Sequence, residues 1–98
     1  MKNNISMKDF YEKYNNEELT ILDVRENHEY AAGHIPSAQN FPLSSLGIEF
    51  TKLDKNQKYY VICQAGGRSA KAYNFLQAQG YTVINVEDGM NSWPGEKK

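Results

Sequence analysis

Cysteine occurs once among the 98 residues of this sequence, at position 63. A single cysteine cannot close a disulfide within the chain, so a fold held together by disulfides is excluded. The composition favours a reducing cytoplasm, in which Cys63 stays a free thiol or thiolate. Any role of Cys63 therefore depends on its packing or on its reactivity.

Long apolar runs are missing as well. No run approaches the ~18 residues that a membrane span requires. Residues 1–6 lack the apolar segment of a secretory signal. These absences predict a cytoplasmic protein that does not use a membrane as a partner.

An excess of charge of one sign is also missing. The chain has 11 basic and 12 acidic residues, which leaves a net charge of −1. The sequence contains no run of lysine or arginine, so it predicts no nucleic-acid partner. The absence of a Walker motif and of a G-x-G-x-x-G motif predicts no nucleotide cofactor. Two histidines and one cysteine without suitable spacing predict no metal site.

The hydrophobic pattern predicts one α/β domain over residues 1–98. Strands are expected at residues 19–24, 59–62 and 83–86, with a weaker strand at 39–41. Helices are expected after an N-cap at Ser6, at 28–32 after Asn27, after Ser44 or Ser45, and at 69–79. Apolar strands that alternate with helices predict a small three-layer domain. It would have a central parallel sheet of four or five strands and helices on both faces.

Three segments that carry chemically useful side chains directly follow predicted strands. They are Asp23–Arg25, Cys63–Ser69 and Glu87–Gly89. Ligands of parallel α/β sheets bind at the carboxyl ends of the strands. We therefore expect these three segments to meet at one edge of the sheet.

Cys63 lies where a buried strand gives way to a helix, and the turn between them contains Gly66, Gly67 and Arg68. Glycines and a helix N-terminus let backbone N–H groups converge on an anion. Such a setting lowers the pKa of a thiol and makes the sulfur a nucleophile. A lone cysteine is otherwise more often a small buried hydrophobic residue. Ser69 is expected mainly as a helix cap.

Other polar residues are expected in supporting roles. Asp23 is better explained as an anchor for loop N–H groups or a partner of Arg25 than as a catalytic base. His28 is expected on an exposed helix, and His34 in a structural role before Pro36.

Three segments together resemble the rhodanese-like sulfurtransferase family, in its single-domain form. The resemblance covers residues 6–93. The active-site segment is Cys63-x-x-Gly66-x-Arg68-Ser69. The segment before it consists of Leu22–Glu26, Glu29-Tyr30, residues 33–38 and Asn40. The segment after it consists of Val86–Gly89 and Trp93. One departure is Asp88, which stands where the family usually has the first of two glycines.

The resemblance implies sulfur transfer through a persulfide on Cys63, as the catalytic residue. The donor would be a small sulfur-containing anion such as thiosulfate, and the acceptor cyanide, an external thiol or a protein thiol. No metal or organic cofactor would be needed. Asp23 and Arg25 would support the site. The substrate-binding residues would be Gln64, Ala65, Gly66, Gly67, Arg68 and Ser69.

Two other functions compete with this interpretation. Phosphatases and arsenate reductases of the same fold resemble this chain, but they have one more residue between cysteine and arginine. The four residues between Cys63 and Arg68 make a smaller ring, which suits a single sulfur atom. The second competitor is a persulfide carrier or a non-catalytic binding module. Retention of Cys63, Gly66 and Arg68 argues against a module without activity.

Overall fold

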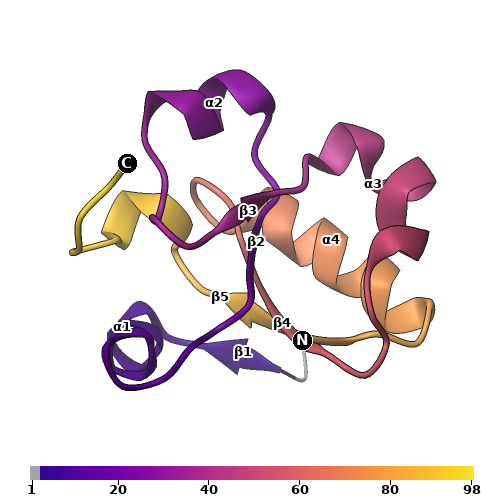
Figure 1. Cartoon of the computed structure of the whole chain (residues 1–98), viewed down its shortest axis with the longest axis horizontal. Coiled ribbons are helices and arrows are strands. Elements are labelled where there is room, and N and C mark those ends of the chain that lie inside the picture. Colours follow the sequence, from indigo (N-terminus) through magenta and orange to yellow (C-terminus); the bar gives the residue numbers. More distant parts are fainter. Residues whose placement is uncertain (1–2) are drawn as a thin grey trace.

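The computed structural model describes residues 3–98, so Met1 and Lys2, part of the segment searched for a secretory signal, lie outside the described residues. Figure 1 shows strands alternating with helices along the chain. In chain order the elements are β1 (Asn4–Ile5), α1 (Met7–Asn16), β2 (Ile21–Asp23), α2 (Asn27–Ala32), β3 (Gln39–Asn40), α3 (Leu43–Glu49), the 3-10 turn η1 (Phe50–Lys52), β4 (Lys58–Ile62), α4 (Gly67–Ala78), β5 (Thr82–Val86) and the 3-10 turn η2 (Gly89–Ser92).

The strands form one sheet in the order β1-β5-β4-β2-β3, and every neighbouring pair is parallel. The predicted parallel sheet is therefore confirmed, with five strands. The sequence pattern did not predict β1, whose two residues pair with Asn85 and Val86 at the end of β5. A two-residue edge strand is too short to produce a period of alternating side chains.

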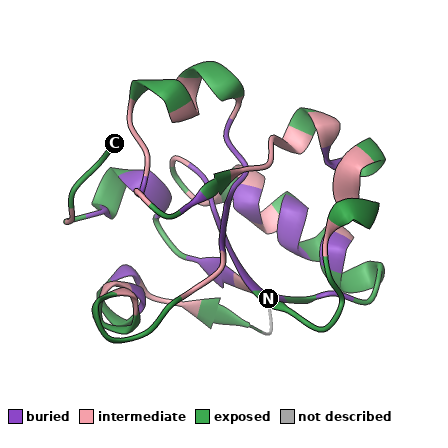
Figure 2. Cartoon of the chain, in the orientation of Figure 1, coloured by how far each residue is buried: buried purple, intermediate pink, exposed green. Residues whose placement is uncertain are grey.

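Apolar side chains fill both faces of the sheet, as the three-layer prediction requires. One core lies between the sheet and α3 and α4, and Leu46, Tyr73 and Leu76 are buried in it. The other lies between the sheet and α1 and η2, where Phe10 and Trp93 are buried. Figure 2 shows that the central strands are mainly buried, whereas α2 is intermediate or exposed.

The predicted N-cap of α1 is confirmed, because the Ser6 hydroxyl accepts from the backbone N–H of Asp9 at 3.1 Å. The cap predicted for α2 at Asn27 is wrong, because Asn27 is already helical and Glu26 is the N-cap. There the Glu29 carboxylate accepts from the Glu26 N–H at 3.0 Å, which is one half of a capping box.

The cap predicted for α3 at Ser44 or Ser45 is also wrong. Pro42 is the N-cap and the helix begins at Leu43. The fixed φ of proline, −57° here, prepares the chain for a helical turn without a capping side chain. Along the described chain, residues 3–98, no helix has the length and apolarity needed to cross a membrane.

Candidate active site

The segment with Cys63 leaves β4, a central strand of the sheet, and meets the segment that follows β5. The backbone N–H of Met90 donates to the Cys63 carbonyl at 2.8 Å, and that of Asn91 to the Gln64 carbonyl at 3.0 Å. On the other side, the N–H of Val24 donates to the Ile62 carbonyl at 2.9 Å. The predicted meeting of the three segments at one sheet edge is confirmed.

The Cys63 residue is buried, with 1% of its surface exposed, and polar groups surround its sulfur. The backbone N–H of Gly66 donates to Sγ at 3.0 Å, and the Ser69 Oγ lies 3.4 Å from Sγ. Burial raises the pKa of the Cys63 thiol. Hydrogen bonds from the Ser69 hydroxyl and from the backbone N–H groups of Ser69, Gly66 and Ala65 together outweigh burial and leave that pKa below its ordinary value.

The helix after the loop begins two residues earlier than the sequence pattern indicated. α4 starts at Gly67, and its N-cap is Gly66, which has a φ of 105°. Ser69 is therefore not the cap. It lies in the first turn, fully buried. Next to the protonated thiol its hydroxyl donates to the Gly66 carbonyl at 3.1 Å, and rotation of the hydroxyl turns the same proton to the Cys63 thiolate. The first-turn N–H groups of a helix have no partner within the helix, and here they start beside Cys63.

The Arg68 guanidinium binds Glu29 of α2 in a two-pronged ion pair. Nη1 donates to Oε1 at 2.5 Å and Nη2 to Oε2 at 2.8 Å. This geometry is the strongest form of the arginine–carboxylate interaction. The sequence pattern did not predict a partner for Arg68. The one indication was an acidic residue, Glu29, in the first turn of a short polar helix.

Arg25 and Asp23 form a buried ion pair, as the sequence analysis favoured. The Arg25 Nη2 donates to Asp23 Oδ2 at 2.8 Å, and the Arg25 backbone N–H donates to Oδ1 at 3.0 Å. Arg25 Nη1 reaches the Gln64 side chain at 3.2 Å, whose amide donates to Asn91 at 2.7 Å. Asp23 thus holds Arg25 in place, and Arg25 and Asn91 together hold the Gln64 side chain.

The remaining predicted residues take structural or exposed positions. His28 is exposed on α2. His34 stacks on Tyr30 with ring centroids 3.7 Å apart, and its Nδ1 lies 2.9 Å from the Tyr30 carbonyl. Asp88 adopts a φ of 65° and so keeps the left-handed turn that glycine usually supplies. Aspartate is among the residues that tolerate this conformation best.

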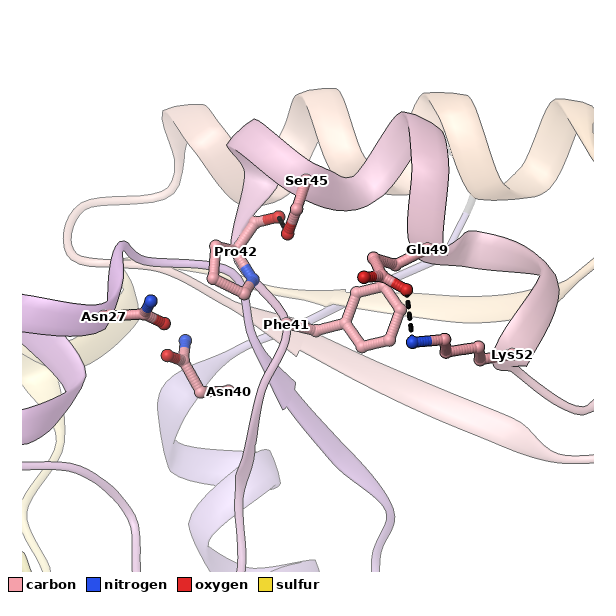
Figure 3. A pocket seen from close by; sticks show the side chains of 7 residues that line it. All are labelled: Asn27, Asn40, Phe41, Pro42, Ser45, Glu49 and Lys52. Carbon is pink, nitrogen blue, oxygen red and sulfur yellow. Dashed lines mark hydrogen bonds and ion pairs between the residues drawn. The ribbon is translucent and has the colours of Figure 1, made fainter.

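A separate hollow of about 340 Å³ lies beside α3 and contains no residue of the Cys63 loop. Figure 3 shows two asparagines at one end of it and a glutamate–lysine ion pair at the other. Its lining residues are Asn27, Asn40, Phe41, Pro42, Ser45, Glu49 and Lys52. Within residues 3–98 no group of three or more histidine, cysteine or acidic side chains is arranged to hold a metal ion.

Residues 6–96 match the family model described as "Rhodanese-like domain". The chain therefore belongs to the rhodanese-like family, which confirms the resemblance noted in the sequence. The fold is that of this sulfurtransferase superfamily.

Individual relatives agree with the family. "Putative sulfurtransferase YtwF" of Bacillus subtilis is 42% identical over 82 residues, which are 84% of this chain and 80% of that protein. "Putative sulfur carrier protein YrkF" of Bacillus subtilis is 40% identical over 94% of this chain, but the chain spans only 51% of that protein. The crystal structure of a rhodanese-related protein from Thermoplasma volcanium is 40% identical, with a TM-score of 0.85 over 93% of this chain and 89% of that one.

Proposed function

We propose that the chain is a sulfurtransferase that moves a sulfane sulfur through a persulfide on Cys63. The donor is a compound such as thiosulfate, and the acceptor is cyanide or a thiol. The observation that carries the proposal is the N–H of Gly66 at 3.0 Å from a buried sulfur with a lowered pKa. A stabilised thiolate is the form of cysteine that attacks sulfur.

The first half-reaction loads the sulfur. The Cys63 thiolate attacks the outer sulfur of thiosulfate, forms a new S–S bond and breaks the S–S bond of the donor, and sulfite leaves with the bonding electron pair. The product is a persulfide anion one sulfur atom longer than the thiolate. The proposed donors that stabilise this anion are the N–H groups of Gln64 to Ser69. Those of Ala65, Gly66 and Ser69 already donate to the Cys63 sulfur.

The second half-reaction unloads the sulfur. Cyanide attacks the outer sulfur of the persulfide, forms thiocyanate and returns the Cys63 thiolate. One sulfur bond is exchanged for another in each half, so the cycle is redox-neutral. Two covalent half-reactions predict ping-pong kinetics.

Delivery of the sulfur to a protein thiol is a second version of the same chemistry. The relative YrkF bears the name of a sulfur carrier, and it is 40% identical to this chain. Cys63 is the only cysteine of the sequence, so the accepting thiol lies outside these 98 residues. The loading step and its residues are the same in both versions.

A phosphatase or arsenate reductase is disfavoured by the loop. Phosphate-binding relatives of this fold have five residues between cysteine and arginine, as the resemblance implies, whereas four separate Cys63 from Arg68. The Arg68 fork also binds Glu29, so its two terminal nitrogens are not both available to a tetrahedral phosphate.

The proposal is tested by initial rates with thiosulfate and cyanide, alongside a chromogenic phosphate ester. We expect thiocyanate formation with ping-pong kinetics and no ester hydrolysis. The variant Cys63→Ser should lose at least about a thousandfold in rate, as expected for removal of a nucleophile. Circular dichroism checks that the variant is folded. Full activity of Cys63→Ser, or ester hydrolysis by the native chain, contradicts the proposal.

A further inference from the structure

Both arginines near Cys63 already have a carboxylate partner. Arg25 is paired with Asp23 in a contact where the two side chains are 5% and 0% exposed. Arg68 is paired with Glu29 through both terminal nitrogens. Neither guanidinium therefore presents a free positive charge to a donor that approaches the sulfur.

The Arg68–Glu29 pair lies where a dissolved molecule can reach it. Their side chains are 34% and 25% exposed, respectively. The charge of Cys63 acts on Arg68, because the thiolate raises the pKa of the guanidinium, after the larger effect of the Glu29 hydrogen bond. The pair thus stands within electrostatic range of the sulfur and of any anion bound there.

The other charges at this edge do not restore a positive field. Lys71 is exposed on α4, but it is outnumbered by carboxylates. Glu26 caps α2 and acts on the charge of Arg68. Asp88 follows Glu87 in the turn that packs against the loop, with its backbone nitrogen close to Gly66. A dianion gains little from such surroundings.

We infer that Glu29 determines which donor the site accepts. By holding the Arg68 fork, it withholds the guanidinium from a doubly charged donor such as thiosulfate and favours an organic persulfide, R–S–SH. This inference rests on the proposed function, since it concerns the donor of the same loading step. Glu29 is a positioning residue that acts through Arg68.

An organic persulfide can load Cys63 without any further reactant. The Cys63 thiolate attacks the outer sulfur of R–S–SH, the S–S bond of the donor breaks, and a new S–S bond forms on Cys63. The proton of the outer sulfur passes to the leaving thiolate, which departs as R–SH. The persulfide on Cys63 carries the negative charge. One S–S bond is exchanged for another, so no oxidant or reductant is consumed. The leaving group is a neutral thiol, which needs no arginine to hold it.

The variant Glu29→Gln isolates the charge from the structure. Glutamine at the third position of a helix preserves a capping box, because its side-chain carbonyl still accepts from the Glu26 N–H. The amide cannot neutralise Arg68, so the guanidinium gains a free charge. Glu17→Gln is the matched control, because Glu17 is an exposed carboxylate at the end of α1 that pairs with Lys13.

The test compares persulfidation of Cys63 by thiosulfate and by the persulfide of 2-mercaptoethanol, which has no charged group besides the persulfide itself. The rate of loading is measured over a range of donor concentrations. We expect the native chain to have a kcat/KM at least about tenfold higher for the organic persulfide. In Glu29→Gln, the KM for thiosulfate should fall about threefold to tenfold with little change in kcat, as expected from one freed charge near a dianion. The KM for the persulfide of 2-mercaptoethanol should change less than about twofold in the same variant, and Glu17→Gln should match the native chain for both donors.

The double variant Glu29→Gln with Arg68→Gln should lose the gain for thiosulfate, because Glu29 acts through Arg68. A native preference for thiosulfate overturns the inference, and so does an unchanged KM for thiosulfate in Glu29→Gln. Both results leave the proposed function standing, since Cys63 is still loaded. Failure of both donors to load the native chain overturns the proposed function itself.

Discussion

The Cys63 thiol combines burial with hydrogen bonds that favour its charged form. Burial alone would keep the sulfur protonated and unreactive, as in most buried cysteines. The N–H of Gly66 and the hydroxyl of Ser69 reverse that effect, and the pKa of Cys63 falls below its ordinary value. Reactivity at this residue therefore comes from its immediate donors and not from exposure.

Removal of the Ser69 hydroxyl should raise the pKa of Cys63. The Ser69 hydroxyl is one of the groups that lower this pKa, so the pKa of Cys63 should be higher in Ser69→Ala than in the native chain. The measurement is the rate of alkylation by iodoacetamide as a function of pH. Ser45→Ala is a matched control, because that hydroxyl binds the Pro42 carbonyl on α3. An unchanged or lower pKa in Ser69→Ala would show that the hydroxyl does not stabilise the thiolate.

The loop after β4 is held by the turn that follows β5. The N–H groups of Met90 and Asn91 donate to the carbonyls of Cys63 and Gln64, so η2 lies directly against the loop. Gly89 has a φ of 59°, and a Cβ there would overlap the Cys63 carbonyl oxygen and come within 2.7 Å of the Gln64 oxygen. Only a residue without a side chain permits this approach.

Gly89→Ala should therefore destabilise the chain by about 2–4 kcal/mol, because both the backbone conformation and the backbone neighbours oppose the methyl group. Gly47→Ala is the matched control. Gly47 is helical, with nothing within 4 Å of its added Cβ. The Gly47→Ala variant should be more stable than the native chain by about 0.5–1 kcal/mol. Urea unfolding measures both free energies, and equal stability of the two variants would contradict the packing described for η2.

At the element level the sequence predicted the main strands and helices well but not their ends. Periodic apolar residues predicted β4, β5, α1 and α4, because each contributes several side chains to a core. The ends depend on single contacts that a pattern does not contain. Ser69 looks like a cap, yet Gly66 caps α4 through its left-handed backbone. Glu26 caps α2 where Asn27 was expected.

The Arg68–Glu29 ion pair beside Cys63 joins elements that are distant along the chain. Glu29 on α2 and Arg68 on α4 are separated by 39 positions. α2 has no buried residue, so this pair is one of the contacts that fix it above the sheet edge. The position of α2 in the molecule is therefore sensitive to the charge of Glu29.

Acid should remove this contribution to stability. The hydrogen bond from Arg68 holds the pKa of Glu29 at about 2, below its ordinary value of 4.5. A carboxyl with a lowered pKa in the folded state stabilises that state fully above pH 4.5, and the effect is lost as pH falls towards 2. The native chain should exceed Glu29→Gln in stability above about pH 5, by no more than about 1 kcal/mol because the pair is partly exposed.

Urea unfolding of both proteins between pH 2 and pH 7 measures this difference. The two free energies should converge as the pH approaches 2. A constant difference across the range would show that the charge of Glu29 is not what links α2 to α4.

For the whole molecule, the sequence predicted the fold class, the shared sheet edge and the family, because each depends on patterns that recur along the chain. It correctly favoured the pairing of Asp23 with Arg25, which are two residues apart. It did not predict the pairing of Glu29 with Arg68, which exists only once the fold brings these two side chains together. The charge state of the site is thus a tertiary property, and the choice of donor depends on it.

The central claim is that Cys63 carries the transferred sulfur as a persulfide. The most direct measurement uses a donor with an isotopically labelled outer sulfur in a single turnover without acceptor, followed by peptide mass spectrometry. We expect one labelled sulfur atom on the peptide that contains Cys63, and transfer of that label to thiocyanate when cyanide is added. Thiocyanate formation with no label on Cys63 at any time, or label on another residue, would contradict it.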